Sequence, residues 1–271
     1  HAKMLELGKT SRREFMGRAV ALGVTAAVAS TMASKALKAA TAKKGGHLRI
    51  GIGAGSTSDS LDPGTFTDSY MQWVGYALRN HLTEVDNDGK LVPELCTGWS
   101  ASDDASQWTF ELRQGVEFHN GKTMDADDVV ASYNHHRGED SKSAAKGVVD
   151  PIQDIKADGK NTVVFTLREG NADFPYIASD YHIPMMPSKD GKVDWASGVG
   201  TGGYVLGDYE PGVRTSFKRN PNFWKDGKGH VDSGEALVIS DVVARTNGLS
   251  TGQLDAMDRC DIKTLTLLER N

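Results

Sequence analysis

The sequence predicts a mixed α/β fold, in which strands and helices alternate along the chain. Residues 108–113 alternate between apolar and polar side chains, as a strand with one buried face does. Residues 70–82 instead carry apolar side chains at helical spacing, which gives a helix one apolar face. Asp-Gly turn signals separate such segments through the middle of the chain. Because both patterns are interleaved, the class is mixed α/β.

The first 42 residues have the three parts of a twin-arginine export signal. The pair Arg12-Arg13 precedes a weakly apolar run at 19–33, and residues 40–42 form a small-x-small cleavage site. A membrane-spanning helix needs about 20 strongly apolar residues, and a basic amphipathic helix would spread its charges along one face. We therefore expect a signal peptide over 1–42, export to the periplasm, and no stable membrane insertion after cleavage.

The charge balance of the remaining chain excludes one class of partner. Without the signal, 24 basic and 34 acidic side chains leave a formal net charge of −10. A nucleic-acid binder normally presents a basic field to phosphates, so we expect no nucleic-acid partner. The two cysteines, Cys96 and Cys260, form no Cys-x-x-Cys spacing and do not indicate a metal site. They can pair in an exported protein or remain buried free thiols, and we favour the free thiols.

The segment after the signal reads as a strand, a loop and a helix. Residues 45–52 alternate apolar and small side chains, which predicts a strand. Residues 53–64 form a loop rich in Gly, Ser and Asp. Candidate caps of the next helix are Thr67, Asp68 and Ser69. Its apolar face is expected to consist of Tyr70, Trp73, Val74, Ala77, Leu78 and Leu82.

Four Asp-Gly-Lys sequences mark turns in the middle of the chain. They begin at Asp88, Asp158, Asp190 and Asp226. Asp-Gly favours the positive φ angles of tight turns, so each copy predicts a hairpin or loop tip. Their flanks and spacings differ, which argues against a repeat array. Around the second copy, residues 154–157 and 163–167 predict a hairpin.

A strand and a capped helix are predicted between residues 108 and 130. The buried face of the strand is expected to consist of Trp108, Phe110 and Leu112, with Trp99 packed beneath them. The helix begins at Asp125, which can cap it, and Asp127 and Asp128 lie in the first turn, where the helix dipole favours negative charge. These aspartates suggest a metal site only weakly, because capping explains them without a ligand. Further strands are predicted at 204–206, 213–219 and 237–239, and a helix at 242–252.

Several motifs follow one another in a distinctive order. They are Leu-Val-Pro-Glu-Leu at 91–95, Gly-Trp-Ser at 98–100, Asp-Asp at 103–104, Trp-Thr-Phe-Glu-Leu-Arg at 108–113, Gly-Val-Glu-Phe-His-Asn-Gly-Lys at 115–122 and Asp-Ala-Asp-Asp-Val-Val at 125–130. In order and spacing this run resembles the signature of family 5 extracellular solute-binding proteins. The segment 200–204 is similar to the family's Gly-Thr-Gly-Pro-Tyr, with Gly203 in place of proline. Residues 219–224 resemble its Arg-Asn-Pro-x-Tyr-Trp, with Phe223 in place of tyrosine.

The resemblance implies one lobe of a two-lobed fold of the periplasmic-binding-protein type II kind. It implies a sheet domain formed by 43–82 and 199–271 and a smaller α+β domain inserted at 83–198. The chain stops about where family members cross into the second lobe, so that lobe is expected to be absent. It also implies a monomer that captures a peptide or a similar small solute and delivers it to the permease subunits of an ABC importer. Nickel, haem or oligosaccharide are alternative solutes within the family.

Loops that follow strands are the places where α/β folds bind ligands. The loop after the first strand leads to our first candidate ligand-binding residues, Thr67, Asp68, Ser69 and Tyr70. The glycine-rich segment at 199–204 supplies two more, Gly202 and Gly203, whose backbone a peptide could approach. Capping and turn formation are equally good explanations for each of these residues.

Neither a metal nor a catalytic function is indicated. His135 and His136 are adjacent, and adjacent side chains on a helix diverge instead of binding one ion, so we expect no metal and no cofactor. The alternative class is an exported enzyme that carries a cofactor, which twin-arginine export would allow. The sequence has no Gly-x-Ser-x-Gly, His-Glu-x-x-His or phosphate-binding loop. We therefore expect a binding protein and not an enzyme.

Overall fold

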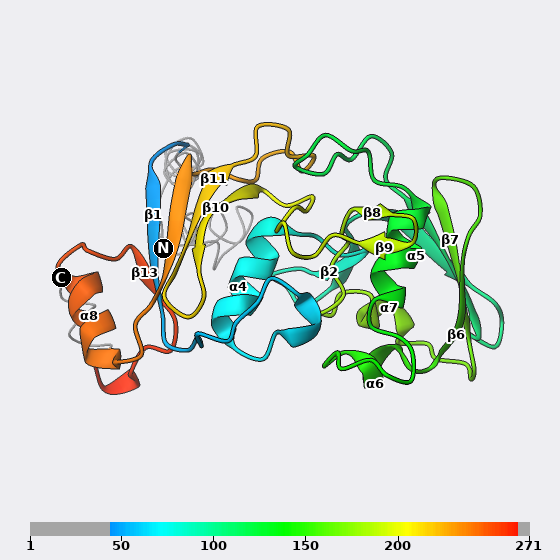
Figure 1. The fold of residues 1–271 in the computed structure, drawn as a ribbon, viewed down its shortest axis with the longest axis horizontal. Helices are drawn as coiled ribbons and strands as arrows, with labels where there is room; N and C mark the ends of the chain where they lie inside the picture. The colour runs from blue at the N-terminus through cyan, green and yellow to red at the C-terminus, as the bar shows by residue number, and fades with distance from the viewer. Residues whose placement is uncertain (1–43, 265–271) are drawn as a thin grey trace, which may run out of the picture. The chain divides into compact units, whose positions relative to one another are not determined.

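The structure is a computed structural model that describes residues 44–264, so the expected signal peptide at 1–42 lies outside the described residues. Strands and helices are interleaved, as predicted (Figure 1). The strands are β1 His47–Ile52, β2 Thr83–Val85, β3 Leu91–Pro93, β4 Cys96–Ala101, β5 Gln107–Leu112, β6 Ile152–Ala157, β7 Thr162–Leu167, β8 Ser188–Lys189, β9 Lys192–Val193, β10 Tyr204–Glu210, β11 Arg214–Arg219, β12 Ser233–Val238 and β13 Ala256–Met257. The helices are η1 Pro63–Thr65, α4 Ser69–Leu78, α5 Ala126–Asn134, α6 Lys146–Val149, α7 Phe174–Ile177, α8 Val242–Ser250 and η2 Ile262–Thr264. No helix within this range has the length and apolar character that a membrane span requires.

The larger sheet has five strands in the order β10-β11-β12-β1-β13. β1 is parallel to both of its neighbours, β12 and β13, whereas β10, β11 and β12 are antiparallel. The carboxyl ends of three parallel strands therefore meet at one edge of the sheet, which is the edge where α/β folds bind ligands. On one face, Ile50 and Ile52 join a core with Phe217 of β11 and Ala236 of β12.

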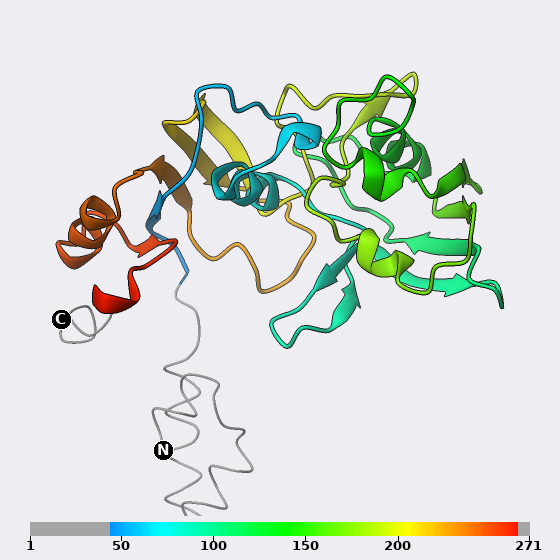
Figure 2. The ribbon, with the colours of Figure 1, turned by 90° about the horizontal axis from the view of Figure 1, so that it is seen from below.

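Helix α4 covers that face of the five-stranded sheet. Asp68 is its N-cap and accepts a hydrogen bond from the Met71 amide at 3.0 Å, which confirms one of the three candidate caps. The predicted apolar face is buried at Tyr70, Val74 and Leu78. Leu82 lies beyond the end of the helix, because the backbone becomes extended at Arg79, and it packs into the second core instead. Figure 2 shows α4 between the five-stranded sheet and the rest of the described chain.

The second sheet has four antiparallel strands in the order β4-β5-β7-β6. The predicted core residues Trp108, Phe110 and Leu112 are buried, and Trp99 packs against them. Phe165 of β7 lies at the centre of this core: its ring centroid is 5.5 Å from that of Phe110, 4.8 Å from that of Tyr133 on α5, and 5.1 Å from that of Phe174 on α7. Edge-to-face packing of this kind adds to the stabilisation from burial alone.

The local signals of this region are confirmed. Asp125 caps α5, and Asp128 forms the reciprocal half of a capping box while also pairing with Lys122. Capping therefore accounts for this aspartate cluster. The predicted hairpin is β6–β7, and the glycines of all four Asp-Gly-Lys turns have φ between 70° and 77°.

Buried polar contacts join the part of the chain with the five-stranded sheet to the part with the four-stranded sheet. They lie where the chain passes from one part to the other. The Arg79 guanidinium donates to the carbonyls of Leu61 and Trp195, both at 2.8 Å. Glu94, from the Leu-Val-Pro-Glu-Leu motif, accepts hydrogen bonds from the Asn80 side chain at 2.8 Å and the His81 amide at 2.7 Å. The glutamate of this motif therefore serves to pair with buried polar groups, since an ionised carboxylate is tolerated in the interior only when it is paired.

Both cysteines are free thiols in the structure, as we favoured. Cys96 is buried, and burial raises the pKa of its thiol to about 11. Cys260 is partly exposed, so the expectation that both thiols are buried is wrong for this residue. It lies in the irregular segment between β13 and η2, and its thiol donates to the carbonyl of Asp261.

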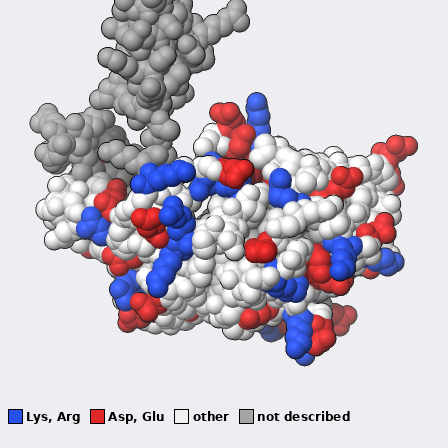
Figure 3. Space-filling view, turned by 90° about the horizontal axis from the view of Figure 1, so that it is seen from above, with Lys and Arg blue, Asp and Glu red and all other residues white. Residues whose placement is uncertain are grey.

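The surface charge is mixed on the face shown in Figure 3. Basic and acidic side chains lie next to each other there, and uncharged areas separate the groups. Such a face differs from the continuous basic surface that a nucleic-acid binder presents.

Candidate functional site

Asp258 organises the carboxyl edge of the five-stranded sheet. One of its carboxylate oxygens accepts a hydrogen bond from the Gly53 amide at 2.7 Å, and the other accepts one from the Ser69 hydroxyl at 3.0 Å. The aspartate follows β13, Gly53 follows β1, and Ser69 begins α4. Three segments that are distant in sequence are thus fixed together at the edge by one carboxylate.

The buried side chain of Arg245 also contacts this edge. Arg245 of α8 is 3% exposed, and its Nε lies 3.6 Å from the Asp258 carboxylate. Its guanidinium also donates to the carbonyls of Ile239 and Ser240, where β12 ends. A side chain at position 53 would come within 2.8 Å of this guanidinium, which explains the glycine there. These contacts therefore hold the carboxyl edge in one arrangement beside the loop between β1 and α4.

The loop between β1 and α4 brings two further carboxylates together. Asp59 accepts a hydrogen bond from the Ser56 amide at 2.7 Å and lies beside Asp68, the N-cap of α4. Burial and the neighbouring Asp68 raise the pKa of Asp59, and the bond from Ser56 only partly opposes them. A positively charged group placed here would relieve the repulsion between the two carboxylates.

The predicted residues 67–70 do not all face the same environment. Thr67 is exposed, and Asp68 and Ser69 are partly exposed at the sheet edge. Tyr70 has no exposed surface, because its ring lies in the core and its hydroxyl is 2.6 Å from that of Thr215. Burial raises the pKa of this phenol to about 12. Only the first three are thus available to a solute in this structure.

The predicted pair Gly202 and Gly203 lies at the other end of α4. The Gly202 amide donates to the Leu78 carbonyl at 2.8 Å, and a side chain at 202 would come within 2.4 Å of the Leu78 backbone. Gly203 lies against the ring of Phe223. A helix of ten residues is about 15 Å long, so the structure does not bring these glycines together with residues 67–69. Close packing against α4 is the reason for Gly202.

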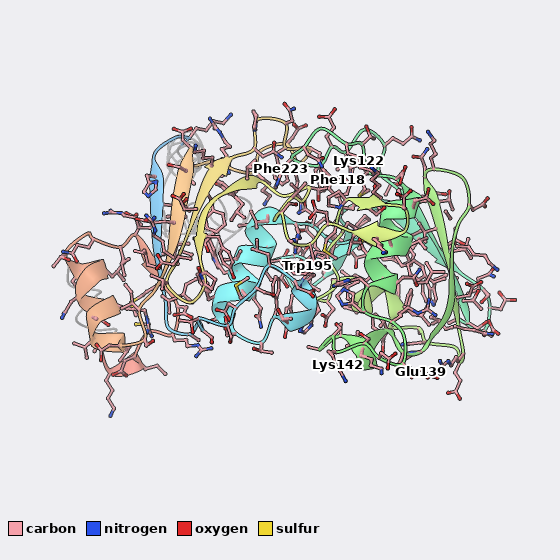
Figure 4. The ribbon with its side chains drawn as sticks, viewed as in Figure 1. Phe118, Lys122, Glu139, Lys142, Trp195 and Phe223 are labelled. Atoms are coloured by element: carbon pink, nitrogen blue, oxygen red, sulfur yellow. The ribbon has the colours of Figure 1, made fainter. Side chains whose placement is uncertain are left out.

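A pocket of about 200 Å³ lies beside η1, which is part of the loop between β1 and α4. It is lined by Asp62, Gly64, Thr65, His135, Ser141, Lys142 and Ser143. The His135 imidazole is 2.8 Å from the Asp62 carboxylate, and the buried His136 is 2.7 Å from the Ser143 hydroxyl. Burial, with the charge of His135, lowers the pKa of His136 to about 4. Figure 4 shows Lys142 and Phe223 on opposite sides of the molecule.

The histidines serve as local partners. His182 contacts the Asp180 carboxylate and the Phe66 carbonyl, and His119 contacts the Gly202 carbonyl. Among residues 44–264, no three His, Cys, Asp or Glu side chains lie together as metal ligands would.

Sequence reasoning missed Asp59 and Asp258 as site residues. Asp258 follows β13, and its contact with Ser69 spans 189 residues. Asp59 stands in a loop that was identified as a candidate for its composition, but nothing local pairs it with Asp68.

Residues 90–271 match the sequence profile of the bacterial extracellular solute-binding proteins, family 5 Middle. Protein XP55 of Streptomyces lividans is 32% identical over 212 residues, which cover 75% of this chain and 38% of that protein. Di/tripeptide-binding protein 1 of Pseudomonas aeruginosa (strain UCBPP-PA14) is 26% identical over 260 residues, with coverage of 85% and 48%.

Among solved structures, the PBP AgaA of A. tumefaciens R10, in complex with agropinic acid, is similar with a TM-score of 0.76 at 25% identity. The similarity covers 83% of this chain and 46% of AgaA. The predicted mixed α/β fold of this type is therefore confirmed. This chain spans less than half the length of each of these three proteins.

Proposed function

This chain belongs to the bacterial extracellular solute-binding proteins of family 5, and we propose that it binds a short peptide or similar small solute at the carboxyl edge of its five-stranded sheet. Proteins of this family are binding proteins and not enzymes. The solute would be handed to the permease subunits of an ABC importer from a periplasmic location, with the protein acting as a monomer. Because the chain spans only part of its relatives, these roles are proposals for the longer protein.

The observation that carries the proposal is the pair of carboxylates of Asp59 and Asp68, in the loop between β1 and α4 at the carboxyl edge of the sheet. Two adjacent carboxylates favour a positively charged group, since a cation would offset the burial and, to a smaller extent, the repulsion from Asp68 that raise the pKa of Asp59. Di/tripeptide-binding protein 1 is named for short peptides, whose amino terminus is cationic at neutral pH. We propose that the solute places an amino group near this pair, with Thr67 and Ser69 beside it.

We also propose the division of this lobe into 43–82 with 199–271 and an inserted part at 83–198. The two sheets with separate cores support this division. In this arrangement the edge residues form one wall of a cleft, and a second lobe would supply the other wall and close over the solute.

The test is a titration of the full-length protein with a dipeptide and tripeptide library and with Ni²⁺, followed by thermal stabilisation and calorimetry. We expect peptides to stabilise the protein, and N-acetylation of a bound peptide to weaken binding by about tenfold or more, as expected for loss of a charged hydrogen bond. Asp68→Asn should weaken the free-amine peptide similarly, because asparagine keeps the helix cap but removes the charge. Asp158→Asn, at the tip of the β6–β7 hairpin, is the matched control and should leave binding unchanged.

Stabilisation by no solute would overturn the transport function. Equal affinity for the free and acetylated peptides would keep the binding function but refute the assignment of the amino group to Asp59 and Asp68.

A further inference from the structure

A cavity of about 430 Å³ lies at the opposite edge of the five-stranded sheet from the candidate solute site. Leu48 and Gly234, near the amino ends of β1 and β12, line it, whereas Gly53 and Asp258 follow the carboxyl ends of β1 and β13. The remaining walls come from the second half of α4 and the residues just after it, from residues 203–204 and 223–231, and from Phe217, Glu84 and Glu94. Its size lies within the range of small-molecule sites, roughly 300 to 1,000 Å³.

The missing side chain of Gly203 helps to keep this cavity open. Gly203 has ordinary backbone angles, so its conformation does not demand glycine, and a β-carbon there would lie 3.3 Å from the Phe223 ring. Gly202, its neighbour, has no such freedom, because a β-carbon would lie 2.4 Å from the backbone of Leu78. Packing thus dictates Gly202, while at 203 any side chain larger than alanine would project toward the space beside Phe223.

The interior of the cavity is aromatic. Trp73 of α4 and Phe217 of β11 pack edge to face, with ring centroids 5.6 Å apart, and Phe223 and Tyr204 complete the aromatic walls. Rings arranged in this way offer both faces and edges to a flat apolar body. The cavity therefore suits a ligand with an aromatic ring.

The charged groups of the cavity leave positive charge without a partner. Lys225 is paired with Glu84 at 2.6 Å and with Glu94 at 3.3 Å. Lys228 lines the mouth, and no acidic side chain within residues 44–264 forms an ion pair with it. Arg79 also contributes to the lining, but its guanidinium donates to the carbonyls of Leu61 and Trp195, and its Nε has no accessible surface.

We propose that this cavity is a second binding site, specific for a small aromatic carboxylate. The ring packs among Trp73, Phe217 and Phe223, and the carboxylate lies toward Lys228. The site is separate from the sheet edge, so its occupancy does not depend on the proposed transport function.

The test uses the whole chain with 3-phenylpropionate as the probe and 3-phenylpropionamide as its uncharged analogue, measured by calorimetry and by Trp fluorescence. We expect the carboxylate to bind about tenfold more tightly than the amide, as a charged hydrogen bond predicts. Lys228→Gln should reduce this preference. Gly203→Val should weaken the carboxylate by about tenfold or more, because the valine occupies part of the cavity.

Lys142→Gln, a lysine change beside the other pocket, is the matched control and should leave probe affinity unchanged. Thermal melting of each variant establishes that it is folded, and Gly203→Ala provides a milder version if the valine variant is not. Equal affinities for the carboxylate and the amide, or full affinity in a folded Gly203→Val protein, would overturn the proposal.

Discussion

The four-stranded and five-stranded sheets are stabilised in different ways. The four-stranded sheet lies against α5 and α7 and shares with them the larger core, at whose centre Phe165 contacts three other aromatic rings. The five-stranded sheet has a smaller core under α4. Its other face carries ion pairs instead, such as Arg49 with Asp255 at 3.1 Å and Arg214 with Glu235 at 3.9 Å. Exposed ion pairs of this kind contribute little to stability.

This difference separates the more extensively packed sheet from the sheet that adjoins both proposed sites. Both candidate sites, the Asp258 edge and the aromatic cavity, adjoin the five-stranded sheet, where packing leaves space and unpaired polar groups. A space of about 700 Å³ also lies beside β6 of the four-stranded sheet, but charged side chains such as Arg137, Glu139 and Arg168 line it instead of aromatic rings. We infer that the part with the four-stranded sheet keeps the structure rigid, while the five-stranded sheet and its loops offer the proposed sites.

The largest expected effect is a core truncation in each sheet. Phe165→Ala should reduce the free energy of unfolding by about 3–5 kcal/mol, the usual loss for a fully buried aromatic ring. Phe217→Ala should cost less, because one side of its ring already adjoins the empty cavity. Urea denaturation at pH 7 measures both. Equal losses would refute the contrast between the two cores.

The second effect is a loss of stability in acid at the contact between α5 and the η1 loop. The pKa of His136, about 4, lies below its unfolded value near 6.5, because burial disfavours the charged ring. The free energy of unfolding that depends on neutral His136 is fully present above pH 6.5 and is lost as the pH falls toward 4. The total loss is about 3 kcal/mol.

Urea midpoints at pH 7 and pH 4.5 measure this effect. His136→Gln should show a smaller fall between the two values than the parent protein, whereas the exposed His47→Gln should behave like the parent. The same fall in all three proteins would show that His136 is not responsible.

The smallest effect has the opposite sign and lies at the sheet edge. The pKa of Asp59 is higher in the folded than in the unfolded protein. Its contribution to the free energy of unfolding is therefore most favourable below the unfolded pKa and is lost as the pH rises through the folded pKa. Asp59→Asn should therefore raise the melting temperature slightly at pH 7 and leave it unchanged near pH 3. The exposed Asp226→Asn serves as the control. A lower melting temperature at pH 7 would indicate that the Asp59 charge stabilises the edge.

Local patterns predicted most of the elements but few of the contacts in the sites. The caps Asp68 and Asp125 and the strand face of Trp108 and Phe110 were correct, because each depends on neighbours only a few residues away. The helical spacing that placed Tyr70 with Val74 and Leu78 already indicated burial, and this signal outweighed its proximity to the loop.

Long-range contacts could not be predicted in the same way. The bond between Ser69 and Asp258 depends on β13 pairing with β1, and no local spacing encodes that pairing. Gly202 and Gly203 looked like one flexible, ligand-facing pair. Only the position of α4 shows that the first is dictated by packing and that the second opens a cavity.

The parallel pairing of β1 with β12 has a consequence for the order of folding. His47 pairs with Ser233, a partner 186 residues away. Closing so long a loop costs conformational entropy before any contact offsets it. The four-stranded sheet forms from nearer, antiparallel neighbours, and once folded it shortens the chain that β1 must span. We therefore expect the five-stranded sheet to assemble late, so that its carboxyl edge, the proposed solute site, is among the last described parts to form.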